Sequence, residues 1–477
     1  MAGINGMDSN HQNTSAKTTG WKKSLLWLAL AVGCFHAAYF SIKYPAAGLL
    51  IFGYAYGLVR LTDQPTVRRA FYFGLATAYL CYAPQLFFMW SIFGPAAIIL
   101  WLVLAFWVGL FAAIICGSRR RWGNAKISWL IPVVWTGLEY FRSELYYLKF
   151  SWLNLGYALP PGDFFCGMYG FGFLVFAIAA LPASGYPFRK LSLFKLLAIT
   201  AVIAMLGWIL LVNLAETKSS RSQRLTITGV QMEFPGEHLL PKMLDRALAK
   251  NTNAVIFVLS EYTLDAGVPD ALKNWCREHS RYLVVGGKDV VTNDVYYNTA
   301  FVVGTNGEVI FKQAKSVPIQ FFHDGLPAPK QDVWNSPWGK IGICICYDLS
   351  YTRVTDRLVG QGAQLLIVPT MDVSDWGRHQ HELHSRVAWV RATEYGIPIF
   401  RVASSGISQA IDWNGRVMTQ TSVGGNGDIF SANLALPASG SLPWDRYLAP
   451  LCVGITGIVL ATLLAASRRR KTQPEPQ

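Results

Sequence analysis

Charged residues are scarce in this sequence. Asp, Glu, Lys and Arg make up 15% of the 477 residues, whereas an ordinary soluble domain has roughly 25%. Apolar residues make up 52% and aromatic residues 14%, which is more apolar surface than one core hides. We therefore do not expect a single soluble domain, and the long uncharged runs indicate an integral membrane protein.

Acidic residues and paired cysteines are also few. There are 28 Asp and Glu against 42 Lys and Arg, which gives a net charge of +14. The basic residues cluster beside apolar runs, as in 119–121 and 468–471, where they mark the cytoplasmic ends of membrane spans. We interpret the charge as a topology signal and expect no nucleic-acid partner.

The eight cysteines form no CxxC pair and no zinc-ligand spacing, so no disulfide framework, metal site or cofactor is expected.

Eight uncharged segments predict membrane-spanning helices. They cover 24–42, 44–59, the two halves of 70–118 on either side of Gly94-Pro95, 127–138, 164–187, 196–215 and 447–467. The 44–59 and 127–138 segments are shorter than the ~20 residues that a perpendicular helix needs. With the N-terminus inside, basic clusters follow every second span, which places the polar segment before the last span outside the cytoplasm.

The predicted organisation therefore has five parts. They are a disordered polar tail (1–20), a membrane domain of seven helices (21–217), an outer domain (218–446), an eighth span (447–467) and a basic tail (468–477). In the outer domain, short β-rich runs alternate with amphipathic segments, which predicts an α/β fold. The expected strands are 225–231, 254–259, 282–286, 299–303, 341–346, 365–369 and 398–402, and the expected helices are 239–249, 269–279, 351–360 and 378–395, with Gly396 as the final cap.

Three strand ends in the outer domain carry residues suited to nucleophilic catalysis. Glu261 follows one strand, Lys312 and Lys315 leave another, and Cys344 and Cys346 share one face of a third. Cys346 lies at the strand end, where turn amides are expected to lower the pKa of its thiol. A carboxylate can act as base for such a thiol, and a lysine can stabilise an oxyanion. Each residue alone also fits a plain role, as a buried cysteine, a solvated acid or a surface lysine.

Together, the order Glu, Lys, Cys at three strand ends resembles the nitrilase (carbon–nitrogen hydrolase) superfamily. With the eight spans, the chain resembles the apolipoprotein N-acyltransferases within it. The matching strings are Gly229-Val230-Gln231, Ser260-Glu261, Gly307 to Lys315, Ile345-Cys346-Tyr347-Asp348, Gly362-Ala363, Pro369-Thr370-Met371-Asp372, Trp376-Gly377, His381, Arg391-Ala392-Thr393-Glu394, Arg401 and Ser405-Gly406-Ile407-Ser408. The resemblance implies an αββα sandwich in which Glu261 is the base, Lys315 the catalytic lysine and Cys346 the nucleophile. Lys315 is preferred over Lys312 by its distance from the preceding Gly-Glu turn.

Several further positions follow from the same resemblance. Tyr347 and Asp348 stand where the family has Tyr-Glu beside the nucleophile. The family's second active-site Glu has no direct counterpart, so its role passes to His323 or Asp324, or is absent. Trp152 matches a Trp segment that faces the active site in the family, although an interfacial aromatic residue fits equally well. His381, Arg386, Arg391 and Glu394 on one predicted helix are interpreted as an internal ion-pair network.

The resemblance implies transfer of an acyl chain from a phospholipid, through a cysteine thioester, to the N-terminal amine of diacylglyceryl-cysteine in an apolipoprotein. The expected partners are these two substrates and the lipid bilayer. The expected location is the bacterial cytoplasmic (inner) membrane, as a monomer whose catalytic domain faces the periplasm. One alternative is a membrane-anchored amidase of the nitrilase type. Another is a transporter with an outer domain, which the scarcity of ionisable residues in the spans disfavours.

Overall fold

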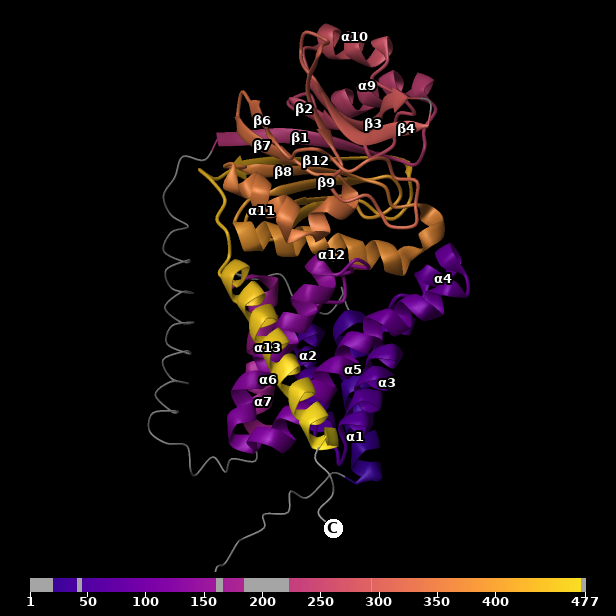
Figure 1. The fold of residues 1–477 in the computed structure, drawn as a ribbon. Coiled ribbons are helices and arrows are strands. Elements are labelled where there is room, and N and C mark those ends of the chain that lie inside the picture. The colour runs from indigo at the N-terminus through magenta and orange to yellow at the C-terminus, as the bar shows by residue number, and fades with distance from the viewer. Residues whose placement is uncertain (1–19, 41–44, 160–165, 184–222, 293, 473–477) are drawn as a thin grey trace, which may run out of the picture.

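The computed structural model describes residues 20–40, 45–159, 166–183, 223–292 and 294–472. In this part of the chain, a helical region is followed by an α/β region and one long C-terminal helix (Figure 1). The predicted tail at 1–19, the predicted span at 196–215 and residues 473–477 of the basic tail lie outside the described residues.

Apolar helices form the N-terminal region. They are α1 (Trp21–Phe40), α2 (Ile51–Leu61), α3 (Val67–Gln85), α4 (Phe88–Phe93), α5 (Ala96–Trp122), α6 (Asn124–Tyr140) and α7 (Gly167–Ala183), and α13 (Asp445–Thr472) packs against them. The apolar block 70–118 breaks where predicted, because Gly94 adopts a left-handed φ of 54° and Pro95 precedes α5. A further break at 86–87 separates α3 from α4, which the sequence pattern does not predict.

Two of the described helices are long and apolar enough to cross a membrane, Ala96–Trp122 and Asp445–Arg469. Shorter apolar helices cover Ala46–Leu61 and Gly167–Pro182. Aromatic side chains fill the space between the helices, and Trp135 of α6 stacks on Phe176 of α7 with ring centroids 4.1 Å apart.

Two six-stranded sheets form the centre of the α/β region. The first has the order β12-β1-β2-β3-β4-β5 and the second has the order β11-β10-β9-β8-β7-β6. The strands are β1 (Gln223–Met232), β2 (Ile256–Val258), β3 (Tyr282–Thr292), β4 (Val295–Val303), β5 (Val309–Ala314), β6 (Val333–Ser336), β7 (Gly339–Ile343), β8 (Leu365–Thr370), β9 (Ile399–Ala403), β10 (Gln409–Ile411), β11 (Val417–Gln420) and β12 (Asn426–Leu436). The parallel strands β1, β2 and β3 in one sheet and β7, β8 and β9 in the other form the middle of each sheet.

The two sheets pack face to face between two helical layers. Alternate residues of β2 show this, because Ile256 and Val258 join a core with Ile343 and Ile367 of the second sheet, whereas Phe257 faces a separate core under the outer helices. The outer helices are α9 (Leu240–Lys250) and α10 (Asp270–His279) on the first sheet and α11 (Thr352–Gly360) and α12 (Arg378–Tyr395) on the second. The predicted αββα layering is therefore present in this region.

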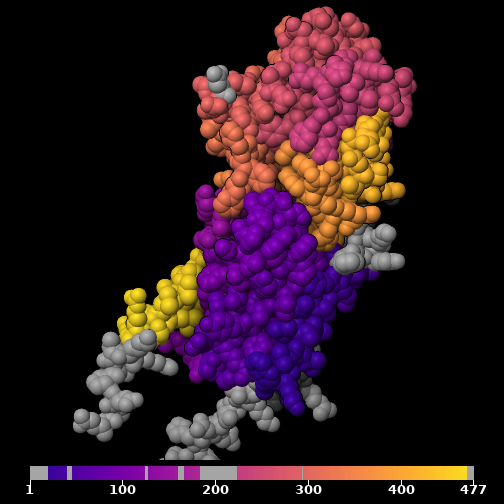
Figure 2. Space-filling model, turned by 90° about the vertical axis from the view of Figure 1, so that its right-hand side faces the viewer, coloured from indigo at the N-terminus to yellow at the C-terminus, as the bar shows by residue number. Residues whose placement is uncertain are grey.

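Helix α12 lies between the second sheet and the helical region (Figure 1). The space-filling view shows the two regions in direct contact (Figure 2). Hydrogen bonds cross this boundary, with the Thr352 amide donating to Glu144 Oε1 over 3.1 Å and the Met168 amide donating to Glu394 Oε1 over 2.6 Å. The α/β region is thus tied to the helices by buried polar contacts as well as by packing.

The structure corrects one predicted strand and adds others. The predicted strand 341–346 ends at Ile343, so Cys346 lies beyond it. Strands β6, β10, β11 and β12 are not predicted, because they are short or, like β12, exposed along one face with no continuous apolar run. Helix α12 has the predicted bounds and ends at Gly396 in a left-handed conformation, with φ of 65°.

We expect Glu394→Gln to destabilise the contact between the two regions. Glu394 is buried and its carboxylate bonds Arg391 and Arg446 in addition to the Met168 amide. Removing one partner of a buried ion pair leaves charge uncompensated, at a cost of about 3–5 kcal/mol. The thermal unfolding midpoint in detergent should fall clearly. Asp289→Asn is the matched control, because its 3.0 Å pair with Lys312 is exposed and should contribute less than about 1 kcal/mol; equal losses in both variants would contradict this assignment.

Candidate active site

Glu261 stands just after β2, with its side chain buried. The Ser260 hydroxyl fixes the turn by donating to the Met232 carbonyl oxygen over 3.0 Å. Strand β3 passes so close that a Cβ at position 286 would lie 2.5 Å from the Glu261 Cα, so only Gly286 fits. The sequence-predicted base is therefore held at a strand end inside the protein and not in solvent.

Lys315, and not Lys312, joins Glu261. Lys315 follows the end of β5 and is fully buried, and its Nζ donates to Glu261 Oε1 over 2.8 Å and to Asp324 Oδ2 over 2.7 Å. Lys312 lies on the surface and pairs with Asp289. Burial thus decides the choice that the sequence leaves open between the two lysines, since Lys315 lies inside the protein and Lys312 on its surface.

Two carboxylates and one amide surround the Lys315 ammonium. Asn298 of β4 donates through Nδ2 to Glu261 Oε1 over 2.6 Å and to Asp324 Oδ1 over 2.9 Å. Asp324 also accepts from the Tyr262 hydroxyl over 2.7 Å and from the Ile319 amide over 2.8 Å. Sequence analysis does not identify Asn298, and the only available signal is a polar residue in the middle of an apolar strand.

Cys346 begins a short 3₁₀ turn, η6 (Cys346–Ser350), with a positive φ of 51°. This conformation is uncommon for a residue with a side chain and is held by surrounding contacts. The Asp348 carboxylate accepts from the amides of Ile345, Ser316 and Val317, so the turn is tied to the segment that follows Lys315.

One residue links the thiol to the carboxylate through its backbone. Met371, just after β8, donates its amide to Glu261 Oε2 over 2.7 Å, and its carbonyl oxygen lies 3.6 Å from Cys346 Sγ as the acceptor for the thiol. The structure therefore brings Glu261, Lys315 and Cys346 into one buried cluster, although each comes from a different strand end. Cys344 is also buried, with no hydrogen bond of its thiol to this cluster among the described residues.

The electrostatics of the cluster shift the pKa values of Glu261 and Asp324 in opposite directions. Burial raises the pKa of Glu261, and the negative charge of Asp324 raises it further against the opposing effect of Lys315. Burial also disfavours the charged form of Asp324, but Lys315 and several hydrogen bonds hold its pKa below the ordinary value. Desolvation would lower the pKa of Lys315, yet the two carboxylates keep it well above its ordinary value. Asp324 is thus the permanent counterion, and Glu261 is the group able to take a proton.

The thiol of Cys346 is held in its neutral form. Burial raises its pKa well above 9.0, the Glu261 charge adds to this effect, and Lys315 opposes it. The net shift is thus upward, opposite to the expectation from the turn amides, because burial and the Glu261 charge dominate. A neutral thiol beside a carboxylate requires base assistance when it attacks a substrate.

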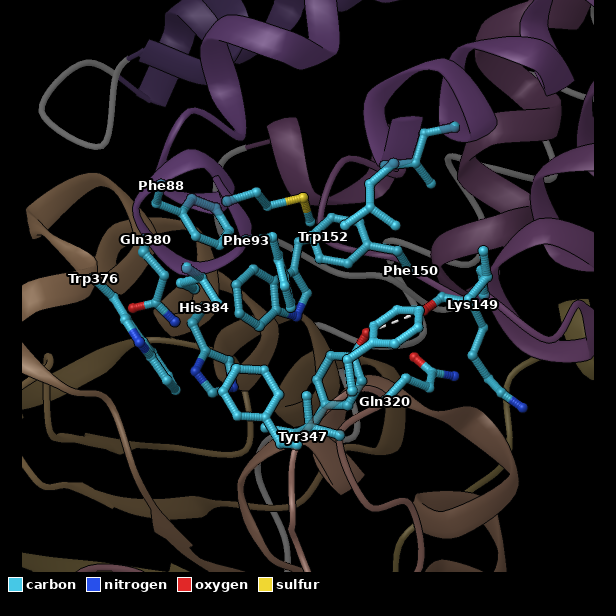
Figure 3. A pocket seen from close by; sticks show the side chains of 18 of the residues that line it. Phe88, Phe93, Lys149, Phe150, Trp152, Gln320, Tyr347, Trp376, Gln380 and His384 are labelled. Atoms are coloured by element: carbon cyan, nitrogen blue, oxygen red, sulfur yellow. Dashed lines mark hydrogen bonds between the residues drawn. The ribbon is translucent and has the colours of Figure 1, made fainter. Parts of the chain in front are cut away.

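An apolar pocket opens beside Cys346 (Figure 3). Its empty volume is about 870 Å³, part of which is open to the surroundings. Helices α4 and α5 and the 148–152 loop supply one part of the wall. The α/β region supplies the other part, with the 319–322 segment, Cys346, Tyr347, Trp376, Gln380 and His384. The pocket is therefore built jointly by the helical region and the α/β region.

Trp152 and Tyr347 lie in this wall. The Trp152 indole donates to the Ser350 hydroxyl over 3.0 Å and stacks on the His384 ring at 4.5 Å, with 18° between the planes. The Tyr347 hydroxyl donates to the Lys149 carbonyl oxygen over 3.1 Å (Figure 3, dashed line). Trp152 is buried, so the structure places it at the pocket and not in an exposed aromatic belt.

The remaining predicted residues divide between the cluster and other contacts. His323 is exposed with its ring against Tyr296, so Asp324 and not His323 reaches Lys315. On α12, Arg391 pairs with Glu394 and donates to the Leu349 and Ser350 carbonyl oxygens of η6, as expected of an internal ion-pair network. Arg386 instead donates to the Tyr39 and Tyr157 carbonyl oxygens of the helical region.

A second buried polar cluster centres on Asp372, the residue after Met371. Its carboxylate accepts from His384 Nδ1 over 2.7 Å, from Arg401 and from Gln380 over 3.2 Å. Burial alone would raise the pKa of Asp372, but His384 and Arg401 hold it well below the ordinary value. His384 and Gln380 carry no distinctive sequence signal beyond lying on one predicted helix. Among the described residues, no group of three or more His, Cys, Asp or Glu side chains could hold a metal ion.

Comparison with known proteins covers both regions. Residues 24–181 match the apolipoprotein N-acyltransferase N-terminal domain, and residues 247–442 match the carbon-nitrogen hydrolase family. The chain is 24% identical over 380 residues to the apolipoprotein N-acyltransferase of Shewanella oneidensis, across 68% of this chain and 72% of that protein. Both regions of the chain thus resemble the apolipoprotein N-acyltransferases.

Two further comparisons extend this result. The apolipoprotein N-acyltransferase of Geobacter metallireducens is 24% identical over 423 residues, which cover 74% of this chain and 79% of that protein. Among solved structures, the carbon-nitrogen hydrolase of Helicobacter pylori G27 aligns with a TM-score of 0.40 and 16% identity over 44% of this chain and 89% of its own. The first of the two family matches covers the helical N-terminal region, and the second covers most of the two-sheet region.

The pKa of the Cys346 thiol can be tested by alkylation. We expect Glu261→Gln to speed iodoacetamide labelling of Cys346 at pH 8 to 9, because losing a nearby negative charge lowers the pKa of the thiol. Lys315→Met should slow labelling, because a neighbouring positive charge is lost. Peptide mass spectrometry gives the rate at each cysteine, with buried Cys344 as the internal control for unfolding. Slower labelling in Glu261→Gln together with faster labelling in Lys315→Met, with Cys344 unlabelled, would overturn the electrostatic account.

Proposed function

We propose that this protein transfers an acyl chain from a phospholipid, through a thioester on Cys346, to the N-terminal amine of diacylglyceryl-cysteine in an apolipoprotein. The observation that carries the proposal is the Glu261–Lys315–Cys346 cluster beside an apolar pocket with a wall of membrane-type helices. A soluble amidase site needs no such wall. The relatives named apolipoprotein N-acyltransferase support the same activity.

In the first half-reaction, Glu261 accepts the Cys346 proton as the sulfur attacks the acyl ester carbonyl. The C–S bond forms, the ester C–O bond breaks, and the proton passes to the leaving lysophospholipid oxygen. Lys315 stabilises the negative charge that develops on the carbonyl oxygen, and its own charge is secured by Asp324. The raised pKa of Glu261 suits this role, because a more basic carboxylate takes the thiol proton more readily.

In the second half-reaction, the acceptor amine attacks the thioester. The N–C bond forms, the C–S bond breaks, and one amine proton returns through Glu261 to the sulfur. The apolar lining of the pocket holds the acyl chain and limits the access of water, which would otherwise hydrolyse the thioester. Tyr347 and Trp152 form part of this lining and hold η6 against the helical region.

We further propose that the helical region spans the inner membrane several times and that the α/β region, 218–446, faces the periplasm. Both α5 and α13 run away from the α/β region (Figure 1), and they end at Arg119–Arg121 and at Arg468 and Arg469. Basic residues at the end of a span favour the cytoplasmic side. The α/β region therefore belongs on the opposite side, where the pocket meets the outer leaflet.

The proposal predicts that Cys346→Ser is inactive in N-acylation. Transfer to a diacylglyceryl-cysteinyl peptide should fall by at least roughly a thousandfold, because removal of a nucleophile leaves only residual catalysis. Mass spectrometry of the peptide and of the intact enzyme measures the product and the acyl-enzyme. Cys344→Ser is the matched control and should retain both.

Two results would contradict the proposal. One is a normal rate of N-acylation by Cys346→Ser. The other is ammonia release from small amides by the wild-type protein without consumption of phospholipid, which would identify an anchored amidase.

We expect Asp324→Asn to move the acid limb of the pH profile for acyl-enzyme formation to lower pH. The Asp324 charge raises the pKa of Glu261, so its removal lowers that pKa, and Glu261 stays ionised further into the acid range. The maximal rate should fall roughly tenfold or more, because the base is weaker. His323→Asn, in which the exposed neighbour is changed, should leave the profile in place. A shift of the limb to higher pH in Asp324→Asn would refute the counterion role.

A further inference from the structure

His384 lines the same pocket as Cys346 but has no part in the proton transfers described above. It lies on α12 and is 2% exposed, between the Trp152 ring and the Asp372 carboxylate. Its ring plane is fixed by the stack on Trp152, and its ring rotation is fixed by the bond to Asp372. A side chain whose orientation is fixed by two independent contacts is typical of a functional site.

The contacts of His384 determine which ring nitrogen carries the proton. Nδ1 lies 2.7 Å from Asp372 Oδ1 and 3.1 Å from an Arg401 nitrogen. A carboxylate oxygen at 2.7 Å requires a donor, so Nδ1 carries the hydrogen and donates to Asp372. Burial and the neighbouring Arg401 and His381 charges lower the pKa of His384 against the effect of Asp372, so the ring is neutral. Nε2 is consequently a bare acceptor.

This acceptor has no hydrogen-bond partner among the described residues, and neither has Gln380 Oε1. Gln380 lies one helical turn before His384 and lines the same pocket, and its Nε2 donates to Asp372, so its oxygen is also a bare acceptor. A buried acceptor without a donor costs about 1–3 kcal/mol. Two such acceptors on one helix face, beside a pocket and anchored on one carboxylate, are complementary to a ligand that brings N–H donors (Figure 3).

We propose that His384 Nε2, with Gln380 Oε1, accepts hydrogen bonds from the amino group of the incoming acyl acceptor and orients it toward the thioester. This rests on the function proposed above. The subsite lies next to the reacting atoms, because Asp372 directly follows Met371, whose carbonyl oxygen contacts Cys346 Sγ. By holding the amine beside the thioester, the subsite raises the rate of its attack relative to that of water.

The neutrality of the subsite matches the chemistry of the second half-reaction. An α-amine has a pKa of about 7.7–8.0 and attacks a carbonyl only in its uncharged form. A carboxylate facing the amine would favour the ammonium form, whereas a neutral imidazole and an amide oxygen bind N–H groups without doing so. The ammonium of a phospholipid headgroup would need a negative partner, but the Asp372 charge is already bonded to Arg401 and His384.

Two substitutions of His384 distinguish the effect of its unpaired Nε2 from the effect of its hydrogen bond to Asp372. His384→Asn retains an N–H at the position of Nδ1 and the bond to Asp372, but it removes Nε2. His384→Gln gives up that bond and offers an amide oxygen near the position of Nε2. His381→Asn is the matched control, because His381 is buried on the same helix near Asp372 but is not part of the pocket wall.

The two half-reactions are measured separately on the full-length protein in detergent. The first readout is the acyl adduct on Cys346 formed from phosphatidylethanolamine or phosphatidylglycerol. The second is the partition of that adduct between a diacylglyceryl-cysteinyl peptide and water, as N-acyl peptide against free fatty acid. We expect His384→Asn to form the adduct within about twofold of wild type and to transfer it about tenfold more slowly, a loss of ~1.4 kcal/mol. His384→Gln should transfer faster than His384→Asn, and His381→Asn should match wild type.

The other outcomes overturn the proposal in distinguishable ways. Equal loss in both half-reactions, or faster transfer by His384→Asn than by His384→Gln, would show that His384 acts through its bond to Asp372. A defect confined to adduct formation from phosphatidylethanolamine would assign His384 to the headgroup of the donor. Absence of an adduct in the wild-type protein would refute the proposed function itself, and not this subsite.

Discussion

The site depends on one fully buried ammonium group held between two carboxylates. An isolated Lys315 cation in this environment would lose its proton, and isolated Glu261 and Asp324 would gain one. Together they leave one net negative charge, which Asn298 and the backbone amides solvate. The two carboxyl groups differ, because the pKa of Asp324 is lowered and that of Glu261 is raised, which suits the base role that we propose for Glu261.

This charge cluster fixes the surrounding backbone. Glu261 accepts the amide of Met371, and the other side of that residue meets Cys346, so the position of the base determines that of the sulfur. Asp348 ties the turn of the nucleophile to the segment after the lysine, and Arg391 holds the same turn from α12. Strand ends that are distant in the chain are thereby coupled without a metal or a disulfide in the described part of the site.

The contact between the two regions gives a hydrolase-type fold the apolar site that the proposed lipid chemistry requires. Soluble α/β domains open their sites to water, whereas here the 148–152 loop and α4 cover the site with aromatic side chains. Buried hydrogen bonds from Trp152 to Ser350 and from Thr352 to Glu144 hold the helical region against η6, the turn that begins with Cys346. Orientation of the attacking amine is the role that we propose for His384 and Gln380, which line the pocket and are both bonded to Asp372.

The sequence by itself predicted the apolar helical region, the αββα layering, most of the strands and the bounds of α12, because hydrophobic periodicity and local motifs are properties of short segments. It also named Glu261, Lys315 and Cys346 as candidates. It left open Lys312 against Lys315 and His323 against Asp324, and it extended β7 to a cysteine that lies beyond it. Only the tertiary structure decided these points, since which neighbour reaches the buried cluster depends on strand register and turn conformation. Asn298, Met371 and His384 likewise acquire their roles through contacts between segments far apart in the chain, and desolvation, which reversed the expected direction for the Cys346 pKa, exists only once the chain is folded.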